Sequence, residues 1–430
     1  MKKVVRHGFF LFLLIGVSCG TYQDVFFAST AIKLPREMYT VSGERVKAIR
    51  LSPGEAAILQ DNDPRNKVNA SFVPLVPRPN KTVRLGGYFF GGFEEKHQLS
   101  QRQLSWIASN LDVLSLNPNY VTDESPNGGG IKPENVVWLK QNNSKLKFYC
   151  MLFATTLREP RFDPAIMSDW VLKNKDGTEA WGVRRNDDAD KDHLMDLGNE
   201  EYAEYFRKFV VEHANEFHAD GVAIDEIMWN GYWGVNVEQL KDYTSVEQIR
   251  FSCYKWLESV AGQSPKEVIH QAFWPEAQKF TNGVWGEVAF VSWWRADKKY
   301  EIFYEEMDYN DILMTISEYG MEGKTYVWAA YYGRDSESEL EYSVATYLLG
   351  KNGEHVVFHP QPVYDGGYPN NLGGYNIQTV MEEYESKKHI FNVELGNPIG
   401  DFYIERIRGD NIWVRQYEAG MVYVNPNKKE

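Results

Sequence analysis

Cysteine is scarce in this chain of 430 residues, since only three are present and no two of them have CxxC spacing. Cys150 and Cys253 each lie inside an apolar segment, so we expect two buried free thiols rather than a disulfide or a metal pair. The chain also has no HExxH sequence, no P-loop and no GxGxxG fingerprint, and its histidines lack zinc spacing. Neither a metal nor a cofactor is therefore expected.

Positive charge is also in short supply, because 46 Lys and Arg residues stand against 60 Asp and Glu and give a formal net charge of −14. Nucleic acid and anionic membrane surfaces would repel such a chain, so neither is expected as its main partner. The 43% hydrophobic and 25% charged residues are typical of a globular protein. Aromatic residues make up 14%, and tryptophan at loop tips is suited to stacking on sugar rings. A neutral or cationic ligand therefore fits this composition.

Long apolar runs are missing as well, and the run at residues 9–17 is too short to span a bilayer comfortably. Basic residues precede this run and small residues follow it up to Cys19, which is the order of a signal peptide. The sequence "GVSCG" resembles the lipobox of bacterial lipoproteins, in which cleavage leaves a lipid-bearing cysteine. Gly16 replaces the usual leucine, so an ordinary secretory signal is the alternative. Residues 1–19 are predicted to direct the protein to the bacterial cell envelope, periplasmic or at the cell surface, with a lipid anchor on Cys19.

The middle of the chain alternates short apolar runs with amphipathic helical patterns. The predicted strands are residues 84–90, 111–117, 145–153, 221–225, 267–271, 283–288, 325–331 and 354–359. The predicted helices include residues 202–217, 240–257, 300–319, 337–349 and 376–388. Strands that alternate with helices in this number predict a (β/α)8 TIM barrel.

The two ends of the chain have a different pattern. Residues 62–82 are rich in proline and lack helical periodicity, so they are predicted to be a linker. Residues 20–61 before this linker, and residues 391–430 after the barrel, alternate and turn as β-hairpins do. The barrel domain is accordingly predicted at residues 83–390, with a β segment on either side of it.

Several stretches, taken in order, carry a resemblance to a known family. The stretches "DLGNEEYAEYFRKFV", "ADGVAIDE", "NGVWGEVAF" and "LGNPIGDFY" resemble TIM-barrel proteins catalogued as hypothetical glycoside hydrolases, distantly related to α-galactosidase-like enzymes. In those relatives a β-sandwich follows the barrel, and "GMVYVNP" is similar to its middle. Its usual last strand occurs here near the N-terminus, as "LSPGEAAIL". The resemblance implies a circular permutation, in which both chain ends form one small β-sandwich-like module.

Two acids lie at the C-terminal ends of predicted strands, at positions whose side chains face the barrel interior. Val222 and Ile224 suit the helix side of the fourth strand, which leaves Asp225 facing the barrel at the strand end where active sites lie. Glu287 ends the sixth strand in the inward phase. Glycosidic cleavage needs two carboxyl groups, and these positions resemble the nucleophile and the acid/base of α-galactosidase-like enzymes. A helix-capping role for Asp225 and a solvated loop role for Glu287 are the alternatives.

Other residues are candidates for substrate binding. Glu226 follows Asp225 and points differently, and the alternative for it is capping the following helical turn. Asp196 precedes a helical stretch, where it either bonds sugar hydroxyls or has a helix-cap or loop role. The aromatic candidates for sugar stacking on or after strand ends are Trp181, Trp229, Trp233, Trp285, Trp294, Trp328 and Tyr331. About half of these aromatics are expected to be core residues instead.

These features together predict a secreted or lipid-anchored glycoside hydrolase that cleaves O-glycosidic bonds of an oligo- or polysaccharide. The alternative is a catalytically inactive glycan-binding surface lipoprotein on the same barrel, because a fold does not determine a function. The two hypotheses differ in whether Asp225 and Glu287 face each other across a pocket.

Overall fold

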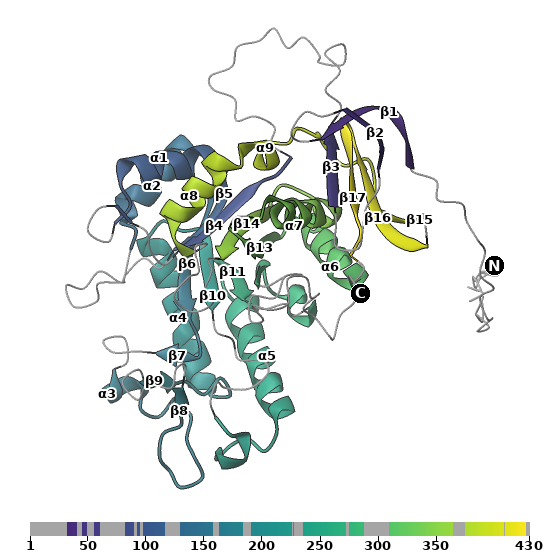
Figure 1. Cartoon of the computed structure of the whole chain (residues 1–430). Coiled ribbons are helices and arrows are strands. Elements are labelled where there is room, and N and C mark those ends of the chain that lie inside the picture. The colour runs from purple at the N-terminus through teal and green to yellow at the C-terminus, as the bar shows by residue number, and fades with distance from the viewer. Residues whose placement is uncertain are drawn as a thin grey trace, which may run out of the picture.

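The computed structural model describes residues 32–40, 45–49, 56–60, 82–89, 93–94, 98–116, 130–157, 163–183, 191–225, 227, 235–271, 275–287, 309–334, 336–363, 375–407 and 409–426. Eight parallel strands close into a barrel, so the predicted TIM-barrel fold is confirmed (Figure 1). In chain order they are β4 (Leu85–Phe89), β5 (Leu111–Leu116), β6 (Lys147–Phe153), β10 (Gly221–Asp225), β11 (Glu267–Gln271), β12 (Gly283–Glu287), β13 (Thr325–Gly333) and β14 (Val356–Val363). All eight predicted strands are present, although β13 and β14 extend beyond their predicted ends.

Helices follow the strands and cover the outside of the barrel. They are α1 (Gln101–Asn110), α2 (Pro133–Asn142), α3 (Pro164–Met167), α4 (Glu200–Glu216), α5 (Val246–Gly262), α6 (Tyr309–Met321), α7 (Glu337–Gly350), α8 (Ile377–Ser386) and α9 (Lys388–Phe391), with short 3₁₀ turns η1 (Val237–Gln239) and η2 (Pro275–Lys279). Asn199 and Ser245 accept hydrogen bonds from backbone N–H groups at the starts of α4 and α5. The Ser245 cap explains why α5 begins later than the predicted residue 240.

A small sheet is inserted between β6 and α4. It consists of β7 (Thr156–Leu157), β8 (Trp181–Val183) and β9 (Lys191–Leu194), in the order β7-β9-β8. Met195 N–H donates to Thr155 O at 2.8 Å, and Ala154 N–H donates to Asp225 O at 3.3 Å. The first bond extends the pairing of β9 with β7, and the second connects the start of the insertion to the C-terminal end of β10.

Two groups of apolar side chains fill the barrel and its outer shell. The inner cluster consists of Tyr88, Val113, Tyr149, Met151, Ala223, Ile269, Trp285, Val327, Ala329 and Val357. Their neighbours along the strands, such as Val222 and Ile224, belong to a larger helix-facing cluster between the strands and the helices. This alternation is the strand periodicity of two, with each strand buried on both faces.

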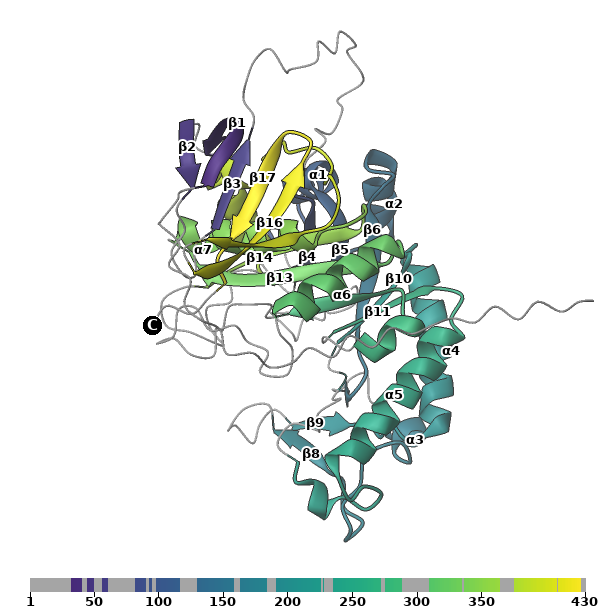
Figure 2. The ribbon, with the colours of Figure 1, turned by 90° about the vertical axis from the view of Figure 1, so that its right-hand side faces the viewer.

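The two ends of the chain meet in one antiparallel sheet, as predicted. Its order is β15-β16-β17-β3-β1-β2, with β1 (Ile32–Thr40), β2 (Arg45–Ile49), β3 (Ala56–Gln60), β15 (Tyr403–Ile407), β16 (Asp410–Tyr417) and β17 (Gly420–Val424). Strand β3 pairs with β17, from Ala56 opposite Val424 to Gln60 opposite Gly420. Figures 1 and 2 show the purple N-terminal strands beside the yellow C-terminal ones.

Among the described residues, the terminal strands form one six-stranded sheet rather than two facing sheets, and α7 provides the layer that covers it. Helix α7 contacts β3, β16 and β17 as well as β13, and eleven of its 14 residues are buried. Arg415 of β16, only 1% exposed, donates to the carbonyls of Leu349 and Lys351 at 2.8 and 2.7 Å. This side chain satisfies carbonyls at the C-terminal end of α7 and fixes the sheet to the barrel.

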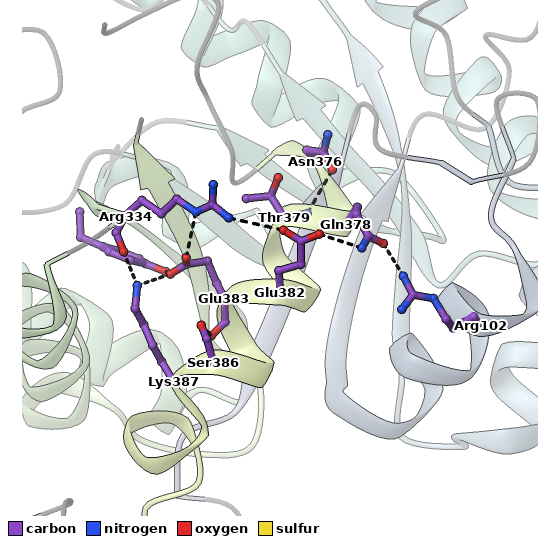
Figure 3. Close-up of polar contacts among 10 residues, drawn as sticks. Arg102, Arg334, Asn376, Gln378, Thr379, Glu382, Glu383, Ser386 and Lys387 are labelled. Atoms are coloured by element: carbon purple, nitrogen blue, oxygen red, sulfur yellow. Dashed lines mark hydrogen bonds and ion pairs between the residues drawn. The ribbon is translucent and has the colours of Figure 1, made fainter. Parts of the chain in front are cut away.

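A polar network joins the end of β13 to α8 and α1 (Figure 3). Glu383, 4% exposed, pairs with Lys387 at 2.5 Å and with Arg334 at 3.5 Å. Gln378 extends the network, because its amide donates to Glu382 at 3.0 Å and accepts from Arg102 of α1 at 2.6 Å. The ends of three βα units are thus held together by charged side chains and the neutral amide of Gln378.

Breaking the buried ion pair should be costly. Lys387→Met is expected to lower the free energy of unfolding by about 3 kcal/mol, because it leaves the buried Glu383 carboxylate without its nearest cation. The matched control is Lys388→Met, which removes an ion pair between side chains that are half exposed and should lower the free energy of unfolding much less. Urea unfolding measures both changes. Equal decreases in the free energy of unfolding for the two variants would show that the buried ion pair stabilises the fold no more than the exposed one.

Candidate functional site

Asp225 lies at the C-terminal end of β10 and faces the barrel interior. Its side chain is only 7% exposed, and its Oδ2 accepts a hydrogen bond from the hydroxyl of Tyr88 at 2.6 Å. Tyr88 belongs to the inner cluster and comes from β4. A hydroxyl that donates to a carboxylate at this length makes a strong, charge-assisted bond. The Asp225 carboxylate is therefore held in one orientation at the barrel mouth.

Aromatic rings form the floor beneath this carboxylate. Trp285 of β12 packs against Tyr88 with ring centroids 4.0 Å apart, and against His359 of β14 with centroids 5.2 Å apart. Trp285 is 2% exposed. It was predicted to be a stacking platform for sugar, and the structure places it instead as an enclosed side chain that packs against the tyrosine holding Asp225.

The contact between Trp285 and His359 shows how the interior layers cross the barrel. Trp285 is level with Val327 on β13, and Val327 is level with Val357 on β14. The ring that Trp285 touches nevertheless belongs to His359, two residues beyond Val357. Because barrel strands are tilted, a layer of interior side chains advances by about one residue per strand and takes its members from alternate strands.

The same step relates Asp225 to Glu287. The register of β10, β11 and β12 makes Asp225 level with Gln271, and Gln271 with Trp285. Two residues beyond Trp285 is Glu287, the last residue of β12. The register position of Glu287 is thus in the Asp225 layer, on the alternate strand, while its carboxyl group lies outside the part of the chain that the structure describes.

Other predicted site residues have mixed outcomes. Glu226, Trp229, Trp233 and Trp294 lie outside the described residues, so their predicted roles stay predictions. Tyr331 is fully buried and its hydroxyl is 3.0 Å from that of Tyr375, so it is enclosed rather than presented as a platform. Trp181 of β8 packs against His193, with centroids 4.6 Å apart.

Trp328 requires a correction. It is fully buried in the helix-facing cluster, with its ring centroid 6.4 Å from that of Tyr326. Val327 and Ala329 on either side of it belong to the inner cluster. Trp328 therefore has the outward strand phase and is a core residue. The prediction considered only its place on the strand and not its phase.

Asp196 organises the turn before α4. Its Oδ1 accepts hydrogen bonds from the Tyr243 hydroxyl at 2.5 Å and from the Gly198 N–H at 2.8 Å. Burial raises the pKa of the Asp196 carboxyl, and these two donors partly oppose that shift. The turn leads to Asn199, which caps α4. These contacts show the loop role, and a contact with sugar stays a prediction.

Two polar interior residues were missed by the sequence reasoning. His359 and Gln361 of β14 are both fully buried, and they share the inward phase of Val357. The alternation in "VVFHPQPV" is the signal that points to them. The predicted strand ends at residue 359, whereas β14 continues to Val363 through Pro360 and Pro362, residues that are unusual inside a sheet.

Comparisons with known proteins leave the family open. No family model and no curated protein matches the chain. Similar solved structures include the glycoside hydrolase domain of PelA from Pseudomonas aeruginosa, at 13% identity and a TM-score of 0.41, over 66% of this chain and 97% of that one. A GH31 dextranase from Flavobacterium johnsoniae has 11% identity and a TM-score of 0.47, over 82% of this chain and 52% of that one. An α-amylase from Malbranchea cinnamomea has 10% identity and a TM-score of 0.45, over 79% and 85%. Likeness at this level carries no functional argument.

The remaining features of the described residues concern metals, thiols, membrane spans and surface hollows. Among these residues, no three His, Cys, Asp or Glu side chains lie close enough together to hold a metal ion. Cys150 and Cys253 are buried free thiols, as predicted, and burial raises the pKa of both. No helix in the described ranges combines the length and apolar character needed to cross a membrane. Two surface hollows of about 390 and 430 Å³ lie beside Phe251 of α5, and Asp225 lines neither.

Two buried histidines should make stability depend on pH. Burial lowers the pKa of His270 to about 4 and that of His359 to about 3, from an ordinary value of 6.5. Below pH 6.5 the unfolded chain binds protons that the folded chain does not, so stability falls as the pH falls toward these values. His270→Gln should reduce the loss of unfolding free energy between pH 6.5 and pH 4 by about 3 kcal/mol.

The measurement is urea unfolding at a series of pH values. His389→Gln is the control, because it changes an imidazole at the surface that is 35% exposed. A pH profile of His270→Gln that matches the profile of the wild type would contradict the prediction.

Proposed function

We propose that this protein is a glycoside hydrolase that cleaves O-glycosidic bonds of an oligo- or polysaccharide at the C-terminal mouth of its barrel. The observation that supports this most is the buried Asp225 carboxylate, which accepts a hydrogen bond from Tyr88. By strand register, Asp225 occupies the same interior layer as the strand position of Glu287. Oxocarbenium-like transition states need two carboxyl groups, one on either side of the scissile bond. Two residues of one interior layer on alternate strands have backbones about 10 Å apart, which leaves room for a sugar between their inward side chains.

The two acids have different roles in this proposal. Asp225, oriented by the Tyr88 hydroxyl, acts as the nucleophile, or as the base that activates water if the enzyme inverts. Glu287 donates a proton to the leaving oxygen. Carboxyl groups about 5 Å apart retain the anomeric configuration, and groups about 6.5–9.5 Å apart invert it. No cofactor is needed for either route.

The test is a panel of chromogenic glycosides and polysaccharides incubated with the purified protein. We expect release of the chromophore or of new reducing ends from at least one substrate class, and NMR of the first product gives the anomeric outcome. The opposite result is binding of a glycan in calorimetry without any new reducing end. That result would favour the inactive glycan-binding lipoprotein over the hydrolase.

We also propose that the mature protein begins at Cys19 and is anchored by lipid in the bacterial cell envelope. The order of basic, apolar and small residues before Cys19 supports this location. A single acyl chain gives only marginal anchoring, so multiple acylation is implied. Cys19→Ser should move the protein from the membrane fraction to the soluble fraction, as measured by immunoblotting. Wild-type protein found wholly in the soluble fraction would refute the anchor.

A further inference from the structure

A third strand contributes to the layer of the two acids. Glu287 is level with Ala329 on β13, and Ala329 is level with His359 on β14. The step of two residues over two strands, which the Trp285–His359 contact establishes, leads from His359 to Gln361. Gln361 therefore occupies the β14 position in the interior layer of Asp225 and Glu287.

The amide of Gln361 is enclosed but unused. The residue is 0% exposed, and neither Nε2 nor Oε1 has a hydrogen-bond partner among the residues that the structure describes. A buried polar group in this condition destabilises a folded protein, so such groups are rare. The protein thus keeps two donors and an acceptor available at the level of its proposed catalytic acids.

Gln103 shows how the same side chain is treated where its role is structural. It is also 0% exposed, but its Oε1 accepts from Ser100 N–H at 3.1 Å and from Glu94 N–H at 3.2 Å. The Gln103 amide completes a capping box at the start of α1. Gln361 makes no comparable bond within the described chain.

The surroundings of Gln361 are polar as well. In the layer below, the Nδ1 of His359 lies 3.2 Å from the carbonyl of Gly86 and donates to it, which leaves Nε2 as an acceptor. Within the described part of the chain, His359 Nε2, Trp285 Nε1 and Ser115 Oγ have no hydrogen-bond partner. Asp225, assigned to the same interior layer as Gln361, is itself only 7% exposed.

We propose that Gln361 is a substrate-binding residue whose amide bonds adjacent hydroxyl groups of the sugar ring held between the two acids. Its Oε1 accepts from one hydroxyl and its Nε2 donates to the neighbouring oxygen, a pairing that suits a neutral vicinal diol. This proposal rests on the proposed glycoside hydrolase function and names the residue that selects its substrate. A site built to bond a hydroxyl discriminates strongly against an analogue that lacks it.

The test uses Gln361→Met, which keeps the length of the side chain and removes its hydrogen-bonding groups. We expect kcat/KM for the best substrate of the panel to fall by about 10- to 1000-fold, while Tm is unchanged or rises by about 2 °C. With monodeoxy versions of that substrate, the wild type should lose rate at one or two ring positions, and Gln361→Met should lose nothing further at those positions. The control Gln103→Met should lower Tm and leave the ranking of deoxy substrates unchanged.

The outcomes separate this inference from the proposed function. If the wild type cleaves glycosides and Gln361→Met slows all deoxy substrates equally, or lowers Tm as much as Gln103→Met, the substrate-binding role is wrong and the hydrolase stands. If the wild type binds the glycosides in calorimetry without cleaving them, weaker binding by Gln361→Met at the same hydroxyls keeps the role of Gln361 and rejects the hydrolase. Equal binding by both proteins, or no binding and no turnover, overturns the inference.

Discussion

Asp225→Asn is expected to abolish turnover on every substrate, with a loss of at least about 10⁴-fold in kcat. The amide is similar in size and can still accept the hydrogen bond from Tyr88, so the local fold should be preserved. It cannot attack the anomeric carbon or activate water, because it carries no negative charge. Circular dichroism and Tm, compared with those of the wild type, should show that folding is intact.

Glu287→Gln should behave differently from Asp225→Asn. Substrates with leaving groups that need no proton, such as dinitrophenyl glycosides, should be largely spared, whereas natural glycosides should lose about 10²–10⁴-fold. The comparison is made by measuring kcat/KM against the pKa of the leaving group. Glu226→Gln is the neighbouring comparison: as a change at a substrate-binding candidate, it should weaken substrate binding without abolishing turnover. An inactive Glu226→Gln beside an active Asp225→Asn would show that the assignment on this strand is wrong.

Deletion of residues 20–61 should cause the second large effect, which is aggregation of the protein. The deletion removes β1, β2 and β3, and β3 pairs with β17 and packs on α7. The backbone edge of β17 and the apolar surface of α7 would then be exposed to solvent, and an unpaired edge is a template for intermolecular pairing. Light scattering and size-exclusion chromatography at 25 °C measure the result.

The matched control is deletion of residues 20–31 alone, which leaves all three N-terminal strands in the chain. This variant should remain monodisperse, with a Tm close to that of the mature protein. A soluble 20–61 deletion with unchanged Tm would show that the N-terminal strands add nothing to the terminal sheet.

Short apolar runs between helical patterns were sufficient to predict the eight strands, and the alternation of side chains along a strand was sufficient to predict the inward phase of Asp225. Strand periodicity is local, because successive side chains point to opposite faces whatever the rest of the chain does. The cap at Ser245 and the early end of α8 at Ser386 are local features too, yet they moved the start of one helix by six residues and the end of the other by two. The fold class survived these shifts, since it depends on the number and order of elements.

The terminal sheet was predicted only in part. The displaced "LSPGEAAIL" strand predicted that the chain ends meet, and β3 does pair with β17. The sequence predicted a sandwich-like module, but the terminal strands form one sheet that α7 covers. This arrangement depends on a helix with apolar residues on all sides. Helix α7 is buried against both the barrel and the sheet, and its sequence alone does not say which partner covers which side.

Sequence alone thus determined the number and order of the barrel strands and that Asp225 and Glu287 stand at the ends of two of them. Only the tertiary structure decided that Tyr88, 137 residues away, holds Asp225, that Trp328 faces the helices, and that Gln361 joins the layer of the acids. The physical reason is the register between neighbouring strands. Hydrogen bonds between segments far apart in the chain set that register, and the tilt of the closed barrel converts it into interior layers.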